Sequence, residues 1–143
     1  TTLDRSLYAP AQGVHRGAYT IRACESGKPE IVILASGSEV EVALGAAEHL
    51  MKKGREVNVV SMPSWELFDA QDAAYQESVF PQAVTKRLAV EAGISMGWCR
   101  YVGTEGNVIS IERFGASAPG QTVMEKFGYS VENVVAQANA LLS

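Results

Sequence analysis

The sequence predicts a layered α/β domain, in which helices cover both faces of a mostly parallel sheet. Three observations support this. Continuous apolar runs rich in β-branched residues, such as 30–36 and 56–62, are typical of strands covered on both sides. Amphipathic helical segments alternate with these runs, as they do in α/β folds. The link 25–29 is too short to hold a crossover helix, so the strands before and after it should run in opposite directions.

Size and composition fit one folded domain and exclude several classes of protein. The chain has 143 residues, of which 47% are hydrophobic and 20% are charged. Its 12 Lys+Arg and 16 Asp+Glu give a net charge of −4 at pH 7. There is no basic cluster and no apolar run near the ~20 residues of a membrane span, so we expect neither a nucleic-acid nor a membrane partner.

The cysteines indicate the redox compartment of the protein, and the first residue bears on whether the chain is a fragment. Cys24 and Cys99 lie far apart and outside any CxxC pattern. This excludes a disulfide framework or a zinc ribbon and suits a reducing compartment. The chain begins at Thr1 without a basic-then-apolar leader. We therefore expect a fragment of a longer protein, which need not carry the chemistry of its parent.

The first elements are predicted from the positions of Pro and Gly and from the alternation of apolar and polar residues. Residues 1–17 contain Pro and Gly without a lasting period and predict an extended lead-in segment. Alternation then predicts a half-buried strand near 18–24. The apolar run 30–36 predicts a core strand, which Ser36–Gly37–Ser38 ends.

The segment 39–53 is a predicted amphipathic helix. Its apolar residues recur at helical spacing on one face. Ser38 with Glu41 forms the pattern of a capping box, and Ser36 with Glu39 offers a second register of the same device.

The later elements continue the alternation of strands and helices. Pro63, Pro81 and Gly93 end the segments that precede them. In chain order we expect a strand at 56–62, a helical turn at 65–69, a helix at 71–79, a strand at 87–92, a helical turn within 94–103, a strand at 107–112, a helix at 119–127 and a last helix capped by Ser130.

A ligand crevice is predicted at the carboxyl ends of the strands, where open α/β sheets bind their ligands. The candidate residues are Gly37, Ser38 and Glu91. The small residues leave room, and the helix that follows them could direct N–H groups at an anion. However, Glu39 and Glu41 would repel a phosphate there, and no nucleotide fingerprint is present.

Glu91 has two interpretations, because it interrupts a core strand close to its end. It could contact a ligand or act as an acid–base group. The alternative is a carboxylate that accepts hydrogen bonds from a neighbouring loop or helix end. Glu112 with Arg113 repeats the pattern at a less buried position.

The other reactive residue types show no catalytic pattern. His15 and His49 have no matching nucleophile or carboxylate, and packing explains Cys24 and Cys99. We expect no metal site. The aromatic residues between 65 and 80 predict core packing, with an interface left open.

An ordered series of motifs runs from about residue 17 to 142. It comprises ILASGSEV at 33–40, VSMPS at 60–64, FDAQD at 68–72, AVEAG at 89–93, YVG at 101–103, FGASAP at 114–119 and FG at 127–128. This series resembles the C-terminal domain of bacterial transketolase. Ser36 stands where that family usually has Thr, and Trp65 and Glu66 stand where smaller residues are common.

The resemblance implies a parent enzyme that depends on thiamine diphosphate and a divalent cation, Mg or Ca. That parent transfers a two-carbon ketol unit from ketose phosphates to aldose phosphates in the pentose phosphate pathway, as a cytoplasmic homodimer. The resemblance also implies a five-stranded sheet with one antiparallel strand over residues 17–143. Residues 1–16 would be a linker from a preceding domain.

The resemblance assigns no catalytic, cofactor-binding or metal residue to this chain. The family's diphosphate and metal motif begins Gly-Asp-Gly, a triplet absent here, and the activating glutamate belongs to another domain. We therefore expect a structural domain that supports the dimer and is inactive alone. Two alternatives remain: a regulatory module that binds a small ligand at the strand ends, and a domain that self-associates through the aromatic 65–80 segment.

Overall fold

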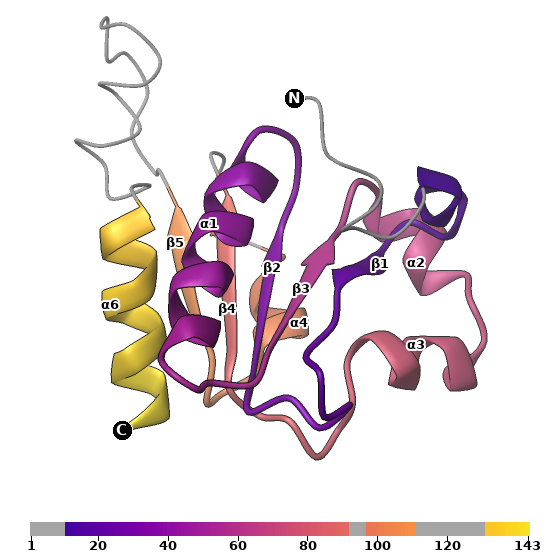
Figure 1. Ribbon diagram of the computed structural model, residues 1–143. Helices are drawn as coiled ribbons and strands as arrows, with labels where there is room; N and C mark the ends of the chain where they lie inside the picture. The colour runs from indigo at the N-terminus through magenta and orange to yellow at the C-terminus, as the bar shows by residue number, and fades with distance from the viewer. Residues whose placement is uncertain (1–10, 92–96, 111–130) are drawn as a thin grey trace, which may run out of the picture.

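A five-stranded sheet forms the centre of the structure, a computed structural model that describes residues 11–91, 97–110 and 131–143 (Figure 1). The strands lie in the order β1-β3-β2-β4-β5. β2 pairs in parallel with β3 and β4, and β4 pairs in parallel with β5. Their bounds are β1 Tyr19–Arg22, β2 Ile31–Ala35, β3 Val57–Ser61, β4 Arg87–Glu91 and β5 Asn107–Ser110. The expected mixed, mostly parallel sheet is confirmed.

The central strand β2 shows why the sequence presents a continuous apolar run. All five of its residues are fully buried. Ile31, Ile33 and Ala35 belong to one core cluster, whereas Val32 and Leu34 belong to the other. Because successive side chains of a strand point to opposite faces, cover on both sides requires an apolar residue at every position.

The edge strand β1 is antiparallel, as the short link predicts, but its partner is β3 and not β2. The link crosses the end of β3, where the backbone N–H of Cys24 donates to Asn58 Oδ1 at 2.9 Å. The prediction of opposite direction is therefore confirmed. The two strands joined by the link are not neighbours, because β3 occupies the place between them.

One face of the sheet is covered by α1 (Glu39–Lys52) and α6 (Val131–Leu142). Figure 1 shows both helices on the same side of the strands. Gly45 is the close-approach point between them, since a Cβ there would lie 3.0 Å from Val131 Cγ2. Both helices match their predicted spans within a residue or so.

The predicted capping box at the start of α1 is not formed. Ser38 already has helical backbone angles of −68° and −20°, and its hydroxyl donates to Glu39 Oε1 at 3.0 Å. A capping side chain needs extended backbone geometry to reach back to the helix N–H groups. In this loop the carbonyls of Ser36 and Gly37 accept from the first N–H groups of α1 instead.

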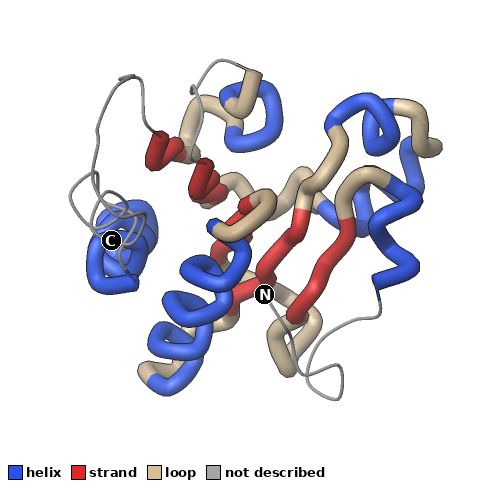
Figure 2. Tube along the Cα trace, turned by 90° about the horizontal axis from the view of Figure 1, so that it is seen from above, coloured by secondary structure: helices blue, strands red, loops and turns tan. Residues whose placement is uncertain are grey.

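The opposite face is covered by α2 (Trp65–Asp69), α3 (Ala73–Val79) and α4 (Cys99–Val102). Viewed from above, the strands lie between the two groups of helices (Figure 2). Phe68, Phe80, Trp98 and Tyr101 are buried and contact one another in tilted or edge-on pairs. Core packing, the default prediction for the aromatic segment, is confirmed for Phe68 and Phe80, whereas Trp65 and Tyr75 are half-buried.

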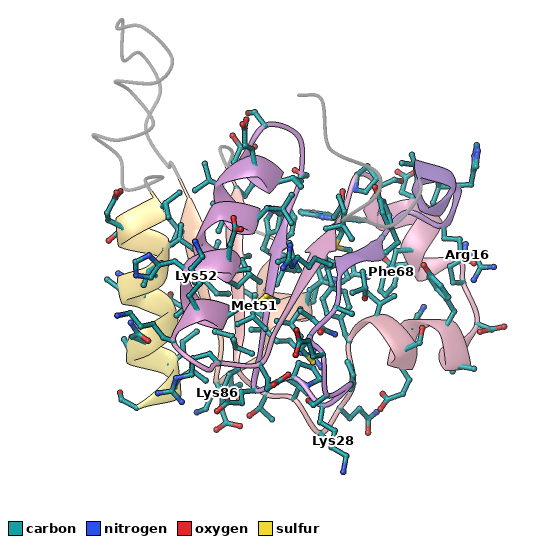
Figure 3. All side chains as sticks on the ribbon, in the orientation of Figure 1. Arg16, Lys28, Met51, Lys52, Phe68 and Lys86 are labelled. Atoms are coloured by element: carbon teal, nitrogen blue, oxygen red, sulfur yellow. The ribbon has the colours of Figure 1, made fainter. Side chains whose placement is uncertain are left out.

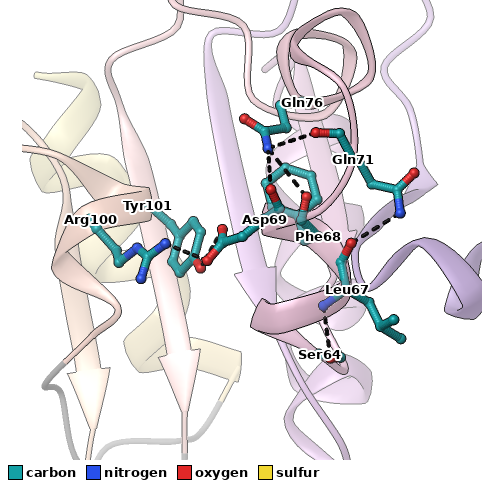
Figure 4. Close-up of polar contacts among 8 residues, drawn as sticks. All are labelled: Ser64, Leu67, Phe68, Asp69, Gln71, Gln76, Arg100 and Tyr101. Atoms are coloured by element: carbon teal, nitrogen blue, oxygen red, sulfur yellow. Dashed lines mark hydrogen bonds and ion pairs between the residues drawn. The ribbon is translucent and has the colours of Figure 1, made fainter.

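Polar side chains tie this helical layer together (Figure 4). Tyr101 Oη donates to Asp69 Oδ1 at 3.0 Å, and Arg100 forms an ion pair with the same carboxylate. Burial raises the pKa of Tyr101 to about 12, and the Asp69 carboxylate contributes a smaller effect in the same direction. Ser64 caps α2 and Asp72 caps α3, each by accepting a backbone N–H three residues on.

Arg87, the first residue of β4, binds the loop carbonyls beneath the aromatic layer. Its guanidinium donates to the carbonyls of Val84, Tyr101, Phe80 and Pro81 at 2.8–3.2 Å. Burial lowers its pKa, because the charged form loses hydration. Four carbonyl partners replace that lost hydration.

The lead-in segment is not extended over its described part. Ala11–Arg16 form a 3₁₀ helix, η1, that packs against α2 and β1. Gly17 permits this packing, because its φ is +84° and a Cβ there would lie 2.3 Å from Phe68 N. Arg16 lies over the Tyr75 ring at 4.6 Å, at the corner labelled in Figure 3. These contacts fix a conformation that local sequence signals do not specify.

Some predicted features lie outside the described residues. They are the helix at 119–127, the cap Ser130, the end of the strand at 111–112, Arg113 and the strand-end residues Ala92–Gly93. The helical turn predicted within 94–103 is present as α4. Within the described part of the chain, no helix has the length and apolarity to cross a membrane.

Candidate functional site

At one position in the sheet, the crossovers from two neighbouring strands go to opposite faces. The crossover from β2 to β3 uses α1 on one face, and the connection from β4 to β5 uses α4 on the other. The carboxyl ends of β2 and β4, which are neighbours, therefore lead to opposite faces. This is a topological switch point, where open α/β sheets bind their ligands.

A hollow of about 380 Å³ opens at this switch point, which we call the switch-point hollow. It is lined by Ser36, Met62, Pro63, Ser64, Trp65, Glu66, Glu91 and Trp98. Trp65 and Trp98 stand nearly perpendicular, with ring centroids 5.3 Å apart and planes at 86°. The hollow therefore combines an aromatic corner with carboxylate and hydroxyl groups.

Glu91 lies at the end of β4 and lines this hollow. Its Oε2 accepts a hydrogen bond of 2.6 Å from the Ser36 hydroxyl, at the end of the neighbouring strand β2. This is the loop contact that one of the two interpretations of Glu91 anticipates. The bond also orients the carboxylate at the wall of the hollow.

Gly37 and Ser38 line a different hollow. This second space, about 340 Å³, lies between the start of α1 and strand β1 and is lined by Tyr19, Ile21, Gly37, Ser38, Val40, Glu41 and Ser61. The structure thus places the three predicted crevice residues at the carboxyl end of the sheet, but the two hollows that the described residues line there do not contain all three. Glu91 lies in one hollow, and Gly37 and Ser38 lie in the other.

Glu39 is a buried carboxylate that sequence reasoning treated only as a first-turn charge. It is 5% exposed, and its Oε1 accepts from the Ser38 hydroxyl. Burial raises its pKa, and the negative charge of Glu91 acts in the same direction. The unused signal was its position in the turn directly after a buried strand, where the helix face turns toward the sheet.

Sequence reasoning also missed Trp65 and Glu66 as site residues. Both follow directly after Ser64 at the end of β3, where α2 begins. The available signal was their departure from the smaller residues common in the resembling family. Because the strand-end position was already predicted as a ligand crevice, that departure pointed to the same place.

The residues at the switch point do not fit a diphosphate with its divalent cation. Glu66 and Glu91 are the charged groups among the described lining residues, and both would repel phosphate oxygens. Within residues 11–91, 97–110 and 131–143, no group of three His, Cys, Asp or Glu side chains could hold a metal ion. We therefore derive no catalytic step through thiamine diphosphate from this domain.

The remaining candidates lie apart from both hollows. His15 and His49 are exposed on η1 and α1. Cys24 is buried, Cys99 is exposed on α4, and neither forms a disulfide. None of these four residues lines either hollow.

Comparisons with known proteins place this architecture in a family. The family described as the transketolase-like TK C-terminal domain matches residues 17–130. A transketolase of Geobacillus stearothermophilus is 52% identical over 141 residues, covering 99% of this chain and 21% of the relative. A transketolase of Aquifex aeolicus is 53% identical over 133 residues, covering 93% of this chain and 19% of the relative. The chain thus spans about a fifth of the length of these relatives.

Solved structures agree with the sequence comparisons. The transketolase of Leishmania mexicana superposes with a TM-score of 0.82 at 41% identity, over 92% of this chain and 18% of that one. A Pichia stipitis transketolase gives 0.84 at 31% identity, over 95% of this chain and 19% of that one. A split-gene transketolase, described as an inactive β4 tetramer, gives 0.66 at 21% identity over 87% and 42%, which shows the fold alone. The chain belongs to the transketolase C-terminal domain family.

Proposed function

We propose that this chain is the C-terminal domain of a transketolase, with a structural role in a larger enzyme. The parent would transfer a two-carbon ketol unit from ketose phosphates to aldose phosphates in the pentose phosphate pathway. The observation that carries the proposal is 52% identity to a transketolase over 99% of the chain. The Pichia relative was solved in complex with sedoheptulose-7-phosphate, a sugar phosphate of the expected substrate class.

The domain alone should have no turnover, because its polar groups have structural partners. Arg87 binds four backbone carbonyls, Asp69 binds Arg100 and Tyr101, and Glu91 accepts from Ser36. Transketolases depend on thiamine diphosphate, and we assign the cofactor and its Mg or Ca ion to the other domains. The acidic switch-point hollow supports this assignment.

The expected partners are the other transketolase domains and a second subunit. We propose that residues 1–16 are the linker from the preceding domain and that residues 17–143 form the domain itself. The split-gene relative, inactive as a β4 tetramer, supports the idea that a transketolase segment needs its complement. The two unpaired thiols agree with a cytoplasmic parent.

The test is an activity assay of residues 1–143 with ketose and aldose phosphates, thiamine diphosphate and magnesium. We expect no ketol transfer from the domain and measurable transfer when the same residues are joined to the preceding domains of a related transketolase. Transfer by the domain alone would overturn the structural role. Failure of the joined protein, if folded, would overturn the family function.

A second candidate function is regulatory binding of a small ligand. The switch-point hollow favours it, because this position of an open sheet is the usual ligand site. Binding to the native state must raise the melting temperature. A screen of nucleotides, sugar phosphates and amines at millimolar concentration tests it, and no shift with any of them would count against regulation.

A further inference from the structure

We propose that the switch-point hollow binds a small organic cation, one that carries an ammonium group. This proposal rests on the second candidate function and names its ligand class. Carboxylates, an aromatic corner and a rigid frame support it separately.

The charges of the hollow favour a cation. Glu66 and Glu91 come from different elements, α2 and β4, and no basic side chain occurs among the described residues that line the space. Lys28 and Lys86 lie at the opposite end of the strands, just before β2 and β4 begin (Figure 3). The charges that the described residues place around the hollow are therefore negative, and they attract cations and repel phosphates.

The two indoles supply the second attraction. Ammonium groups bind over aromatic faces, Trp best of all. Trp65 and Trp98 form an edge-to-face pair at the wall of the hollow. Trp98 is 2% exposed and forms the inner wall, whereas Trp65 is half-buried at the opening.

Gly97 holds the aromatic corner in place. Its φ is +95°, and a Cβ at this position would lie 2.4 Å from Trp65 Cζ3. The Trp65 ring therefore packs directly on the Gly97 backbone. A side chain there would displace the ring from the wall of the hollow.

The Glu91 carboxylate and the start of the helix that carries Glu66 are both held in place. The Ser36 hydroxyl fixes Glu91, and Ser64 caps the helix that carries Trp65 and Glu66. A site that is ordered before binding loses less entropy when the ligand arrives. The volume of about 380 Å³ is within the usual range for small-molecule sites.

The chain offers its own reporter for a binding test. It contains two tryptophans, and both line this hollow. The experiment is a titration of the whole chain with choline, followed by tryptophan fluorescence at constant ionic strength. The matched control ligand is the neutral analogue of choline in which a quaternary carbon replaces the nitrogen.

We expect a saturable fluorescence change with choline and little change with the neutral analogue. Glu66→Gln and Glu91→Gln should each weaken choline binding by about tenfold, because each removes one charge beside the ligand. Gln at position 91 can still accept from Ser36, and Glu66 is exposed, so both variants should fold. Glu48→Gln, on the exposed face of α1, is the control variant and should bind as the parent does.

Three results would overturn the proposal. They are no response to choline, an equal response to the neutral analogue, and unchanged binding in both Gln variants. A melting-temperature shift with sugar phosphates but not with choline would keep the regulatory function and reject the cation. The ketol-transfer assay reads the transketolase role independently of all these outcomes.

Discussion

The Ser36 hydroxyl donates a 2.6 Å hydrogen bond to the Glu91 carboxylate, across 55 positions of sequence. Ser36 directly follows β2 and Glu91 ends β4, so the bond joins the carboxyl ends of neighbouring parallel strands, where their crossovers separate. It places a half-buried carboxylate beside the switch-point hollow and gives that carboxylate a fixed partner.

Loss of the Ser36 hydroxyl should destabilise the domain. Ser36→Ala leaves the Glu91 carboxylate without this donor, and a hydrogen bond to a charged group contributes roughly 1.5–3 kcal/mol. We expect the free energy of unfolding in urea to fall by about 2 kcal/mol. Ser36→Thr keeps the hydroxyl and should lose much less, so an equal loss in both variants would contradict the role of the bond.

Arg87 should not be replaceable by lysine. Its planar fork serves four carbonyls, and an ammonium group cannot reach them all. Arg87→Lys should lower the free energy of unfolding by roughly 2–4 kcal/mol. The matched control is Arg55→Lys, in an exposed pair with Glu30, which should cost less than about 0.5 kcal/mol.

Gly17 should tolerate no side chain, for two separable reasons. Its φ of +84° disfavours any L-residue, and a Cβ would lie 2.4 Å from Ser64 O. Gly27 has a φ of +76° with nothing within 4 Å of its Cβ position, so it isolates the first reason. Thermal unfolding should show a cost of about 1 kcal/mol for Gly27→Ala and several times more for Gly17→Ala.

The buried Glu39 should make stability fall as pH rises. Burial raises its pKa in the folded state above the ordinary value of 4.5, so the native state binds more protons than the unfolded state between the two values. Stability therefore decreases with pH through that window and stays lowered above it. Glu39→Gln should be more stable than the parent at pH 7, with an advantage that shrinks as pH falls through that window and is lost below pH 4.5.

A second variant checks the same carboxylate. Ser38→Ala removes the donor that lowers the pKa of Glu39, so its stability should fall more steeply with pH than that of the parent. Urea unfolding at a series of pH values measures both variants. A Glu39→Gln advantage that grows toward acid would contradict the direction of the shift.

The sequence predicted most of the fold because the apolar pattern is strong. The continuous apolar run of β2 is compatible only with a strand buried on both faces, and the single apolar face of α1 only with an amphipathic helix. It did not predict η1 or the placement of β1 beside β3, since both depend on contacts with distant residues such as Phe68 and Asn58. Local signals cannot encode such contacts.

The candidate site was predictable in position but not in composition. The strand-end rule located the crevice, and Glu91 was selected as a charged residue in a core strand. Its separation from Gly37 and Ser38 depends on the side to which each loop turns. Glu39 was not recognised as buried, because a carboxylate in the first turn of a helix is more commonly a solvent-exposed charge that interacts with the helix dipole.

The alternating burial of β2 has a consequence for how the domain opens. Its odd and even residues are covered by separate helical layers, so release of either layer alone leaves the other in contact with the strand. The amide protons of β2 should therefore exchange with deuterated solvent only when the whole unit unfolds. Their exchange rates would measure global stability directly, without any denaturant.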